Sequence, residues 1–145
     1  MARRVTRAVG DRNRAAARYS RGVRTLADAS LSPTERRAVD RLLGLLEAEL
    51  GPHLLAVWLY GSRARGEPET PDSDVDLLVV SDRGAPDDDL RVIELAIEAA
   101  ASVDANLASL SVKLYDPDLI AQRRSVRSFF LQEVDRDKIV LAGKV

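Results

Sequence analysis

The sequence predicts one α/β (α+β) domain in which a mixed β-sheet of three to four strands is flanked by helices. The length of 145 residues is that of a single domain with a sizeable core. Two apolar runs of strand length, at residues 54–60 and 74–80, follow each other along the chain, and helical patterns precede and follow them. The order helix, strand, strand, helix, strand, helix is typical of a sheet covered by helices.

The first predicted helix begins after Ser32, because Ser32, Pro33 and Glu35 form a capping-box pattern with proline at the first helical position. Apolar residues then recur at helical spacing until Gly51-Pro52 ends the helix. These residues are Val39, Leu42, Leu43, Leu46 and Leu50.

Residues 54–60 form a continuous apolar run, which predicts a central strand covered on both faces. A turn at 61–66 and a proline-containing loop at 67–73 follow. The second strand is predicted at 74–80. After Gly84-Ala85-Pro86 a helix is expected, with an acidic first turn that suits the positive end of the helix dipole. Its predicted apolar face is Leu90, Ile93, Ile97 and Ala100.

The third strand is predicted at 107–115, where apolar and polar residues alternate. Leu110, Val112 and Leu114 are expected on one face, and Ser109, Ser111 and Lys113 on the other. Asp116-Pro117 then caps a last helix, and residues 139–141 add a short edge strand. That helix is expected to contain Leu119, Ile120, Phe129, Phe130 and Val134.

The first residues of the chain are strongly basic. Residues 1–24 hold eight arginines and one aspartate, a charge of +7, which leaves −8 for the remainder. We therefore divide the chain into a basic N-terminal arm at 1–30, helical or disordered, and a domain at 31–145. The arm could be a solvated extension, or it could reach an acidic partner, the body of its own molecule or a nucleic acid. An organelle transit peptide is a further alternative.

The composition excludes several classes of protein. The chain has no cysteine, so disulfide frameworks, thiol nucleophiles and thiolate zinc sites are ruled out. No apolar run approaches the length of a membrane span, and the N-terminus lacks the apolar core of a secretory signal. We expect a cytoplasmic protein without a membrane partner.

Two acidic residues open the second predicted strand. Because strand residues two apart point to the same face, Asp74 and Asp76 are expected to project their carboxylates side by side. Like charges this close resist ionisation unless a cation lies between them. Mg²⁺ suits such a site, since it prefers hard oxygen ligands and is often shared between carboxylates and substrate phosphates.

The turn after the first strand supplies the opposite charge. Gly61 allows backbone amides to approach an anion closely, and Ser62 adds a hydroxyl donor. Arg63 and Arg65 follow, and a guanidinium group can pair with phosphate in a bidentate manner. The sequence therefore predicts a phosphate site at Gly61, Ser62, Arg63 and Arg65 beside the acidic pair.

Each motif is common alone, but their combination is specific. The segments 59–66 and 73–77, Leu-Tyr-Gly-Ser-Arg-Ala-Arg-Gly and Ser-Asp-Val-Asp-Leu, resemble the signature of the minimal nucleotidyltransferases of the DNA polymerase beta superfamily. The resemblance extends over residues 32–141. It implies a nucleotidyltransferase fold, catalytic and metal-binding roles for Asp74 and Asp76, and transfer of a nucleoside monophosphate, AMP from ATP, to an acceptor hydroxyl.

The same resemblance implies a third carboxylate on the next strand, where it would complete the metal site and help to deprotonate the acceptor. Here Ser109 or Ser111 stands at that place, and Lys113 on the same face could replace the charge of one metal ion. Asp104 and Asp116 flank the strand and would need a shifted register to reach the site. Without this base, acceptor activation should be slower by roughly a hundredfold to ten-thousandfold.

Two functions follow from these observations. Small members of the family are antitoxins that transfer AMP to a tyrosine of a helical HEPN-type toxin, which implies a protein hydroxyl as the acceptor. Aminoglycoside-modifying members carry additional sequence that this chain lacks. The alternative is a catalytically weak or inactive binding module that neutralises its partner by contact.

Overall fold

The structure is a computed structural model that describes residues 23–104 and 109–143. The predicted helices and strands are present in the predicted order, except that the last helix is divided and a short helix opens the turn after the first strand. The elements are α2 (Pro33–Leu50), β1 (Leu54–Tyr60), α3 (Gly61–Ala64), β2 (Val75–Ser81), α4 (Asp88–Val103), β3 (Leu110–Tyr115), α5 (Pro117–Ser125), α6 (Phe129–Asp137) and β4 (Ile139–Gly143), with short 3-10 helices at Leu26–Asp28 and Gly51–His53.

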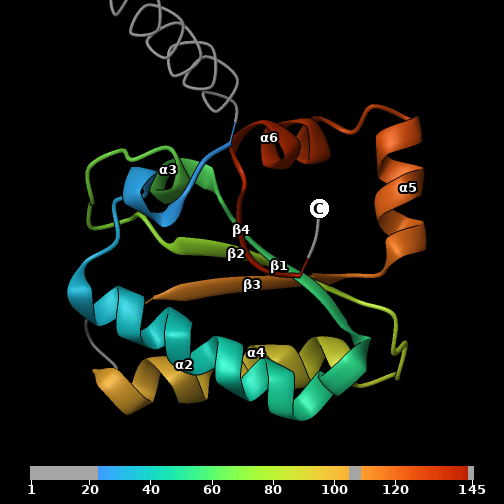
Figure 1. The fold of residues 1–145 in the computed structure, drawn as a ribbon, viewed down its shortest axis with the longest axis horizontal. Coiled ribbons are helices and arrows are strands. Elements are labelled where there is room, and N and C mark those ends of the chain that lie inside the picture. The colour runs from blue at the N-terminus through green and yellow to red at the C-terminus, as the bar shows by residue number, and fades with distance from the viewer. Residues whose placement is uncertain (1–22, 105–108, 144–145) are drawn as a thin grey trace, which may run out of the picture.

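The four strands form one mixed sheet in the order β3-β2-β1-β4. β1 runs antiparallel to both β2 and β4, whereas β2 and β3 are parallel. Figure 1 shows α2 and α4 against one face of the sheet and α5 and α6 on the other side. The predicted mixed sheet flanked by helices is thereby confirmed, with β4 as the predicted edge strand.

The capping box at the start of α2 is present as predicted. The Glu35 backbone amide donates to Ser32 Oγ at 3.1 Å, and the Ser32 amide donates to Glu35 Oε1 at 2.8 Å. Such a box satisfies amides that the first helical turn leaves without partners. Four of the five predicted apolar residues, Val39, Leu42, Leu46 and Leu50, are buried against the sheet, and Leu43 packs at the margin of this core.

The prediction for the buried face of α4 was wrong. Leu90, Ile93 and Ile97 are 59%, 46% and 65% exposed, whereas the helix buries Val92, Leu95, Ala96 and Ala99. Asp88 explains the rotation, because its buried carboxylate accepts hydrogen bonds from the Ala85 amide and from Arg83, which turns position 88 inward. Even with apolar residues on both sides of α4, the described part of the chain contains no helix that is long and apolar enough to cross a membrane.

The predicted last helix is two helices. α5 begins as predicted, with the Asp116 side chain accepting from the Leu119 amide, but it ends at Ser125. Arg127 then takes a left-handed backbone conformation with φ 51°, which a continuous right-handed helix cannot contain. The break redirects α6, so that Leu131 and Val134 pack with Trp58 and Leu78 on the second face of the sheet.

The first described residues belong to the body of the domain. Arg24 donates to the Ala64 carbonyl, and the Ser30 amide donates to the Arg63 carbonyl. Leu26 and Ala29 pack against the core. We therefore propose that the domain begins near Arg24 rather than at residue 31. The rest of the basic arm, residues 1–22, lies outside the described residues, and with it the proposed nucleic-acid contact.

Candidate active site

The two acidic residues lie where β2 begins. Asp74 precedes the strand and is exposed, and Asp76 is half-buried, opposite Tyr60 of β1 and Ser111 of β3. Directly opposed residues on neighbouring strands point to the same face, so Asp76 shares a face with Tyr60 and therefore with Trp58 and Leu78. The acidic pair thus lies on the sheet face that α5 and α6 cover only in part.

The glycine turn directly touches this pair. Gly61 has φ 77°, and a Cβ atom built on it would lie 2.6 Å from Asp76 Oδ2. No other residue could occupy this position without moving the carboxylate, and only glycine adopts this φ without strain. The structure therefore brings together Gly61, Ser62 and Asp76, three of the predicted site residues. Among the described residues, the Ser62 hydroxyl has no hydrogen-bond partner.

Repulsion within the acidic pair is visible in the electrostatics of Asp76. Burial, and after it the charge of Asp74, raises the pKa of the Asp76 carboxyl above its ordinary value of 3.8. The positive charges of Lys113 and Arg65 act in the opposite direction and only partly offset the rise. A divalent cation between the two carboxylates would relieve the same repulsion.

The neighbouring strand presents hydroxyl groups to the pair. Ser109 Oγ donates to Asp74 Oδ1 at 2.7 Å, and Ser111 is the register partner of Asp76. Asp116 lies beyond the opposite end of β3, where its side chain caps α5, and Asp104 lies at the end of α4. Within residues 23–104 and 109–143, no three acidic, histidine or cysteine side chains gather as a metal-binding group. Serines thus occupy the place where the family resemblance implies a third carboxylate.

Arg63 does not fit its predicted role as a phosphate ligand. Its side chain is 1% exposed and forms a buried ion pair with Glu35, with one contact at 2.8 Å between Nη1 and Oε2. Its Nε also donates to the Ser30 carbonyl at 2.8 Å. The guanidinium therefore fastens the turn to α2 and to the segment before it, and it points away from the cleft.

Arg65 lies nearer to the predicted site but is already paired. It contacts Glu67 at 2.9 Å and the buried Asp137 of α6 at 2.9 Å, and these partners raise the Arg65 pKa. It is 32% exposed and close enough to Asp76 to affect the pKa of that carboxyl. In this geometry Arg65 can contribute charge to the cleft, and its hydrogen bonds join the turn to α6.

An aromatic cluster beside the carboxylates was not predicted as part of the site. The Phe130 ring packs edge-on against Tyr60 at 5.4 Å between ring centroids and lies 5.9 Å from Tyr115. Lys113 Nζ lies 4.4 Å from the centroid of Phe130. Burial, followed by the charge of Asp76, raises the pKa of Tyr60 to about 12. The sequence contains little sign of this cluster, because the break at Arg127 decides where Phe130 lies.

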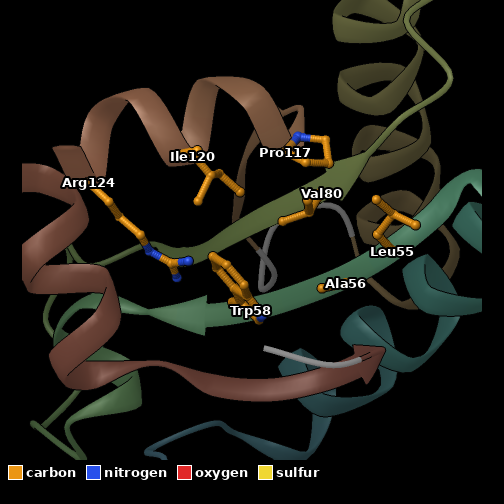
Figure 2. A pocket seen from close by; sticks show the side chains of 8 residues that line it. Leu55, Ala56, Trp58, Val80, Pro117, Ile120 and Arg124 are labelled. Atoms are coloured by element: carbon orange, nitrogen blue, oxygen red, sulfur yellow. The ribbon is translucent and has the colours of Figure 1, made fainter.

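A pocket of about 220 Å³ lies further along the same sheet face, beneath α5. Figure 2 shows Arg124 extending from α5 toward Trp58, with Ile120, Pro117 and Val80 along the mainly apolar wall. None of its eight lining residues belongs to the predicted site. The carboxylates and the glycine turn, rather than this pocket, are the candidate active site.

Comparison with known proteins decides the family. The sequence model of the nucleotidyltransferase domain matches residues 39–136, about two-thirds of the chain, and this span includes both strands and the turn that form the site. The chain belongs to the nucleotidyltransferase domain family. Membership supports nucleotidyl transfer as the general activity of this nucleotidyltransferase domain.

Solved structures similar to this nucleotidyltransferase domain include two variants of the toxin–antitoxin pair MntA-HpeT. One is 24% identical and covers 70% of this chain and 71% of its own, with a TM-score of 0.47. The other is 25% identical, with a TM-score of 0.46, and the match covers 73% of this chain and 72% of the other chain. A protein of Sulfolobus solfataricus, provisionally assigned as a nucleotidyltransferase, is 19% identical, with a TM-score of 0.41. The match covers 79% of this chain and 90% of that protein. No curated protein matches the sequence.

The residues of this nucleotidyltransferase domain fit a magnesium ion. Two carboxylates lie on one side of a strand, one of them exposed and the other half-buried. Burial, and after it the charge of Asp74, raises the pKa of Asp76, so a cation bound between the two carboxylates would favour the ionised form. Mg²⁺ commonly takes one or two protein carboxylates and completes its shell with water and substrate phosphates. The donor set is therefore sufficient for a magnesium ion shared with a nucleotide.

Proposed function

We propose that this domain transfers a nucleoside monophosphate, AMP from ATP, to a hydroxyl group of a partner protein such as a HEPN-type toxin, in the cytoplasm. The observation that carries the proposal is the contact between Asp76 and the Gly61 turn, with Asp74 beside it. Groups suited to bind a cation and groups suited to bind phosphate are adjacent there, which supports the proposal because nucleotidyl transfer needs both. The protein acceptor rests on the resemblance of the motif to the minimal nucleotidyltransferases.

The proposed roles follow from the positions of the residues. Asp74 and Asp76 would hold Mg²⁺, which when bound neutralises phosphate charge and orients the triphosphate. The Ser62 hydroxyl, which lacks a partner among the described residues, and the amides at Gly61 and Ser62 would hold the outgoing phosphates. Arg65 would add positive charge from the edge of the cleft. Catalysis would come mainly from positioning and from stabilisation of charge.

Ser109 and Ser111 favour a second candidate function, a binding module that acts by contact with its partner. A hydroxyl is a poor base, so neither serine can do what a carboxylate would do for the acceptor proton. The domain could then bind a nucleotide and a partner protein with little or no transfer. The two candidates differ in whether label moves from the nucleotide to the partner.

The test uses the purified full chain, magnesium, ATP labelled at its α-phosphate, and a purified helical HEPN-type protein as the candidate partner. An active transferase should place label on the partner, and the label should be lost in Asp76→Asn and retained in Asp118→Asn, a matched change at an exposed aspartate of α5. Partner binding without label in every variant would favour the binding module. If a magnesium complex of a non-hydrolysable ATP analogue binds equally to the wild type and Asp76→Asn, the proposed site is wrong.

A further inference from the structure

The two positively charged side chains near the acidic pair differ in whether they form ion pairs elsewhere. Two cations lie near Asp76: Lys113, two residues beyond Ser111, the register partner of Asp76, and Arg65, which follows the Gly61 turn that contacts Asp76. Arg65 is held by Glu67 and Asp137. Lys113 has no carboxylate partner among the described residues, and its side chain is exposed. Lys113 is therefore the positive charge in the cleft that remains available to a ligand.

The Lys113 side chain rests on an aromatic ring beside the cleft. Its Nζ lies over the ring of Phe130, which Tyr60 and Tyr115 fix from two sides. A cation over an aromatic face is attracted by the negative charge density of that face. In the sheet, Lys113 is two residues beyond Ser111 on the same face, roughly 7 Å further along the strand from the partner of Asp76. An ammonium group on a flexible stem can cover that distance.

β3 provides few ligands for a second divalent cation. Asp74 and Asp76 lie at the start of β2. On the β3 side of the cleft lie the neutral hydroxyls of Ser109 and Ser111 and the ammonium group of Lys113. A hydroxyl compensates no charge, and one ligand oxygen of Asp74 is already engaged by Ser109. An ammonium group repels a cation, so a second ion beside the first would be under-coordinated and opposed by charge.

We propose that this domain binds its nucleotide with a single divalent cation, held by Asp74 and Asp76, and that Lys113 contacts the nucleotide phosphates and supplies the positive charge on the β3 side of the cleft. The inference rests on the proposed function and specifies how this chain meets the phosphates without a further carboxylate. It makes Lys113 a substrate-binding residue.

The test counts cations in the full chain with Mn²⁺ in place of Mg²⁺. With protein in excess over an ATP analogue that has a methylene group between its α- and β-phosphorus atoms, electron paramagnetic resonance should show one bound Mn²⁺ per analogue, without magnetic coupling. Two coupled Mn²⁺ ions per analogue would overturn the inference and leave the proposed function standing. Failure of the analogue to bind at all would remove both.

Two sets of variants test the role of Lys113. Lys113→Met should weaken binding of the analogue roughly tenfold to a hundredfold, which is the contribution expected from one charge-assisted hydrogen bond. Lys138→Met is the matched control, because Lys138 Nζ lies 4.1 Å from the centroid of the Trp58 ring, away from the acidic pair. Unchanged affinity in Lys113→Met would contradict the proposal. The double variant Ser111→Asp/Lys113→Met should gain a second, coupled Mn²⁺, and a count that stays at one would show that the charges on β3 do not exclude a second cation.

Discussion

Asp76 Oδ2 lies so close to Gly61 that a single added methyl group on the glycine would be 2.6 Å from it. The contact joins a carboxylate at the start of β2 to a turn at the end of β1, fifteen positions earlier in the chain. It exists because β1 and β2 pair antiparallel with Tyr60 opposite Asp76, which places the end of one strand at the beginning of the other. The proposed site depends on this pairing.

Replacing Gly61 by alanine tests this contact. The φ of 77° is a left-handed conformation that costs a residue with a side chain about 1–2 kcal/mol, and the new methyl group would also displace Asp76. We expect a lower free energy of unfolding in urea and loss of nucleotide binding. Gly44→Ala is the control, since Gly44 is in α2 with no atom within 4 Å of the added group, and it should gain up to about 1 kcal/mol. Equal effects at the two glycines would contradict the contact.

The acidic pair predicts a characteristic dependence of stability on pH. Folding raises the pKa of Asp76, so the ionised side chain destabilises the folded chain when no divalent cation is present. Asp76→Asn should therefore have the higher free energy of unfolding at neutral pH, and the advantage should vanish as the pH falls below the ordinary carboxyl pKa of 3.8. Urea unfolding across this range measures the difference. An advantage that grew on acidification would show that the direction of the shift is wrong.

Addition of Mg²⁺ should reverse the order at neutral pH. The cation stabilises the wild type by binding to the folded state, and it should do little for Asp76→Asn. The same unfolding experiment at several magnesium concentrations provides the measurement. A wild-type stability that does not change with magnesium, with or without nucleotide, would count against the metal role of the pair.

The buried ion pair between Arg63 and Glu35 predicts a structural rather than a phosphate-binding role for Arg63. Arg63→Met leaves the buried Glu35 carboxylate without its cationic partner and should cost about 3–5 kcal/mol. Asp135→Asn, which weakens the more exposed pairs of Asp135 with Arg124 and Lys138, should cost at most about 1 kcal/mol.

The double variant Arg63→Met/Glu35→Leu separates folding from binding. It removes both charges together and should recover part of the lost stability, because Glu35→Leu also removes the capping contact with the Ser32 amide. If Arg63 only fastens the turn, the refolded double variant binds nucleotide nearly as well as the wild type. A stable double variant that had lost nucleotide binding would restore Arg63 to the phosphate site.

The buried face of α4 can be tested with two neighbouring residues of similar size. Leu95→Ala should cost about 2–5 kcal/mol, because Leu95 is buried in the core. Ile97→Ala should change the free energy of unfolding by no more than about 0.5 kcal/mol, because Ile97 is 65% exposed. The reverse ranking would support the face predicted from the sequence.

Comparison of the sequence predictions with the structure shows which features neighbouring residues determine. The capping box at Ser32 and the apolar strands are set by neighbouring residues, and their predictions hold. The adjacency of Gly61 and Asp76 follows from the antiparallel pairing of the two strands, because Tyr60, the residue before Gly61, lies opposite Asp76. The alternation of β3 was also predicted correctly, because successive strand residues point to opposite faces, and Leu110, Val112 and Leu114 lie on the core side.

Features that depend on tertiary partners were not predictable in this way. α4 is apolar on two sides, and its orientation was decided by the Arg83 contact of Asp88. An arginine after a glycine turn suits phosphate as well as it suits Glu35, and only the packing of α2 against the turn distinguishes the two. The break at Arg127 has no glycine or proline to mark it, so the sequence pattern predicts one helix where there are two.

The central claim, that Asp74 and Asp76 hold a divalent cation together with a nucleotide beside the Gly61 turn, is tested most directly by calorimetric titration of the full chain with a non-hydrolysable ATP analogue, with and without Mg²⁺. We predict binding that requires Mg²⁺ in the wild type and in the control Asp118→Asn, and that is lost in both Asp74→Asn and Asp76→Asn. Binding of equal affinity without Mg²⁺, or undiminished binding in the Asp74→Asn/Asp76→Asn double variant, would contradict it.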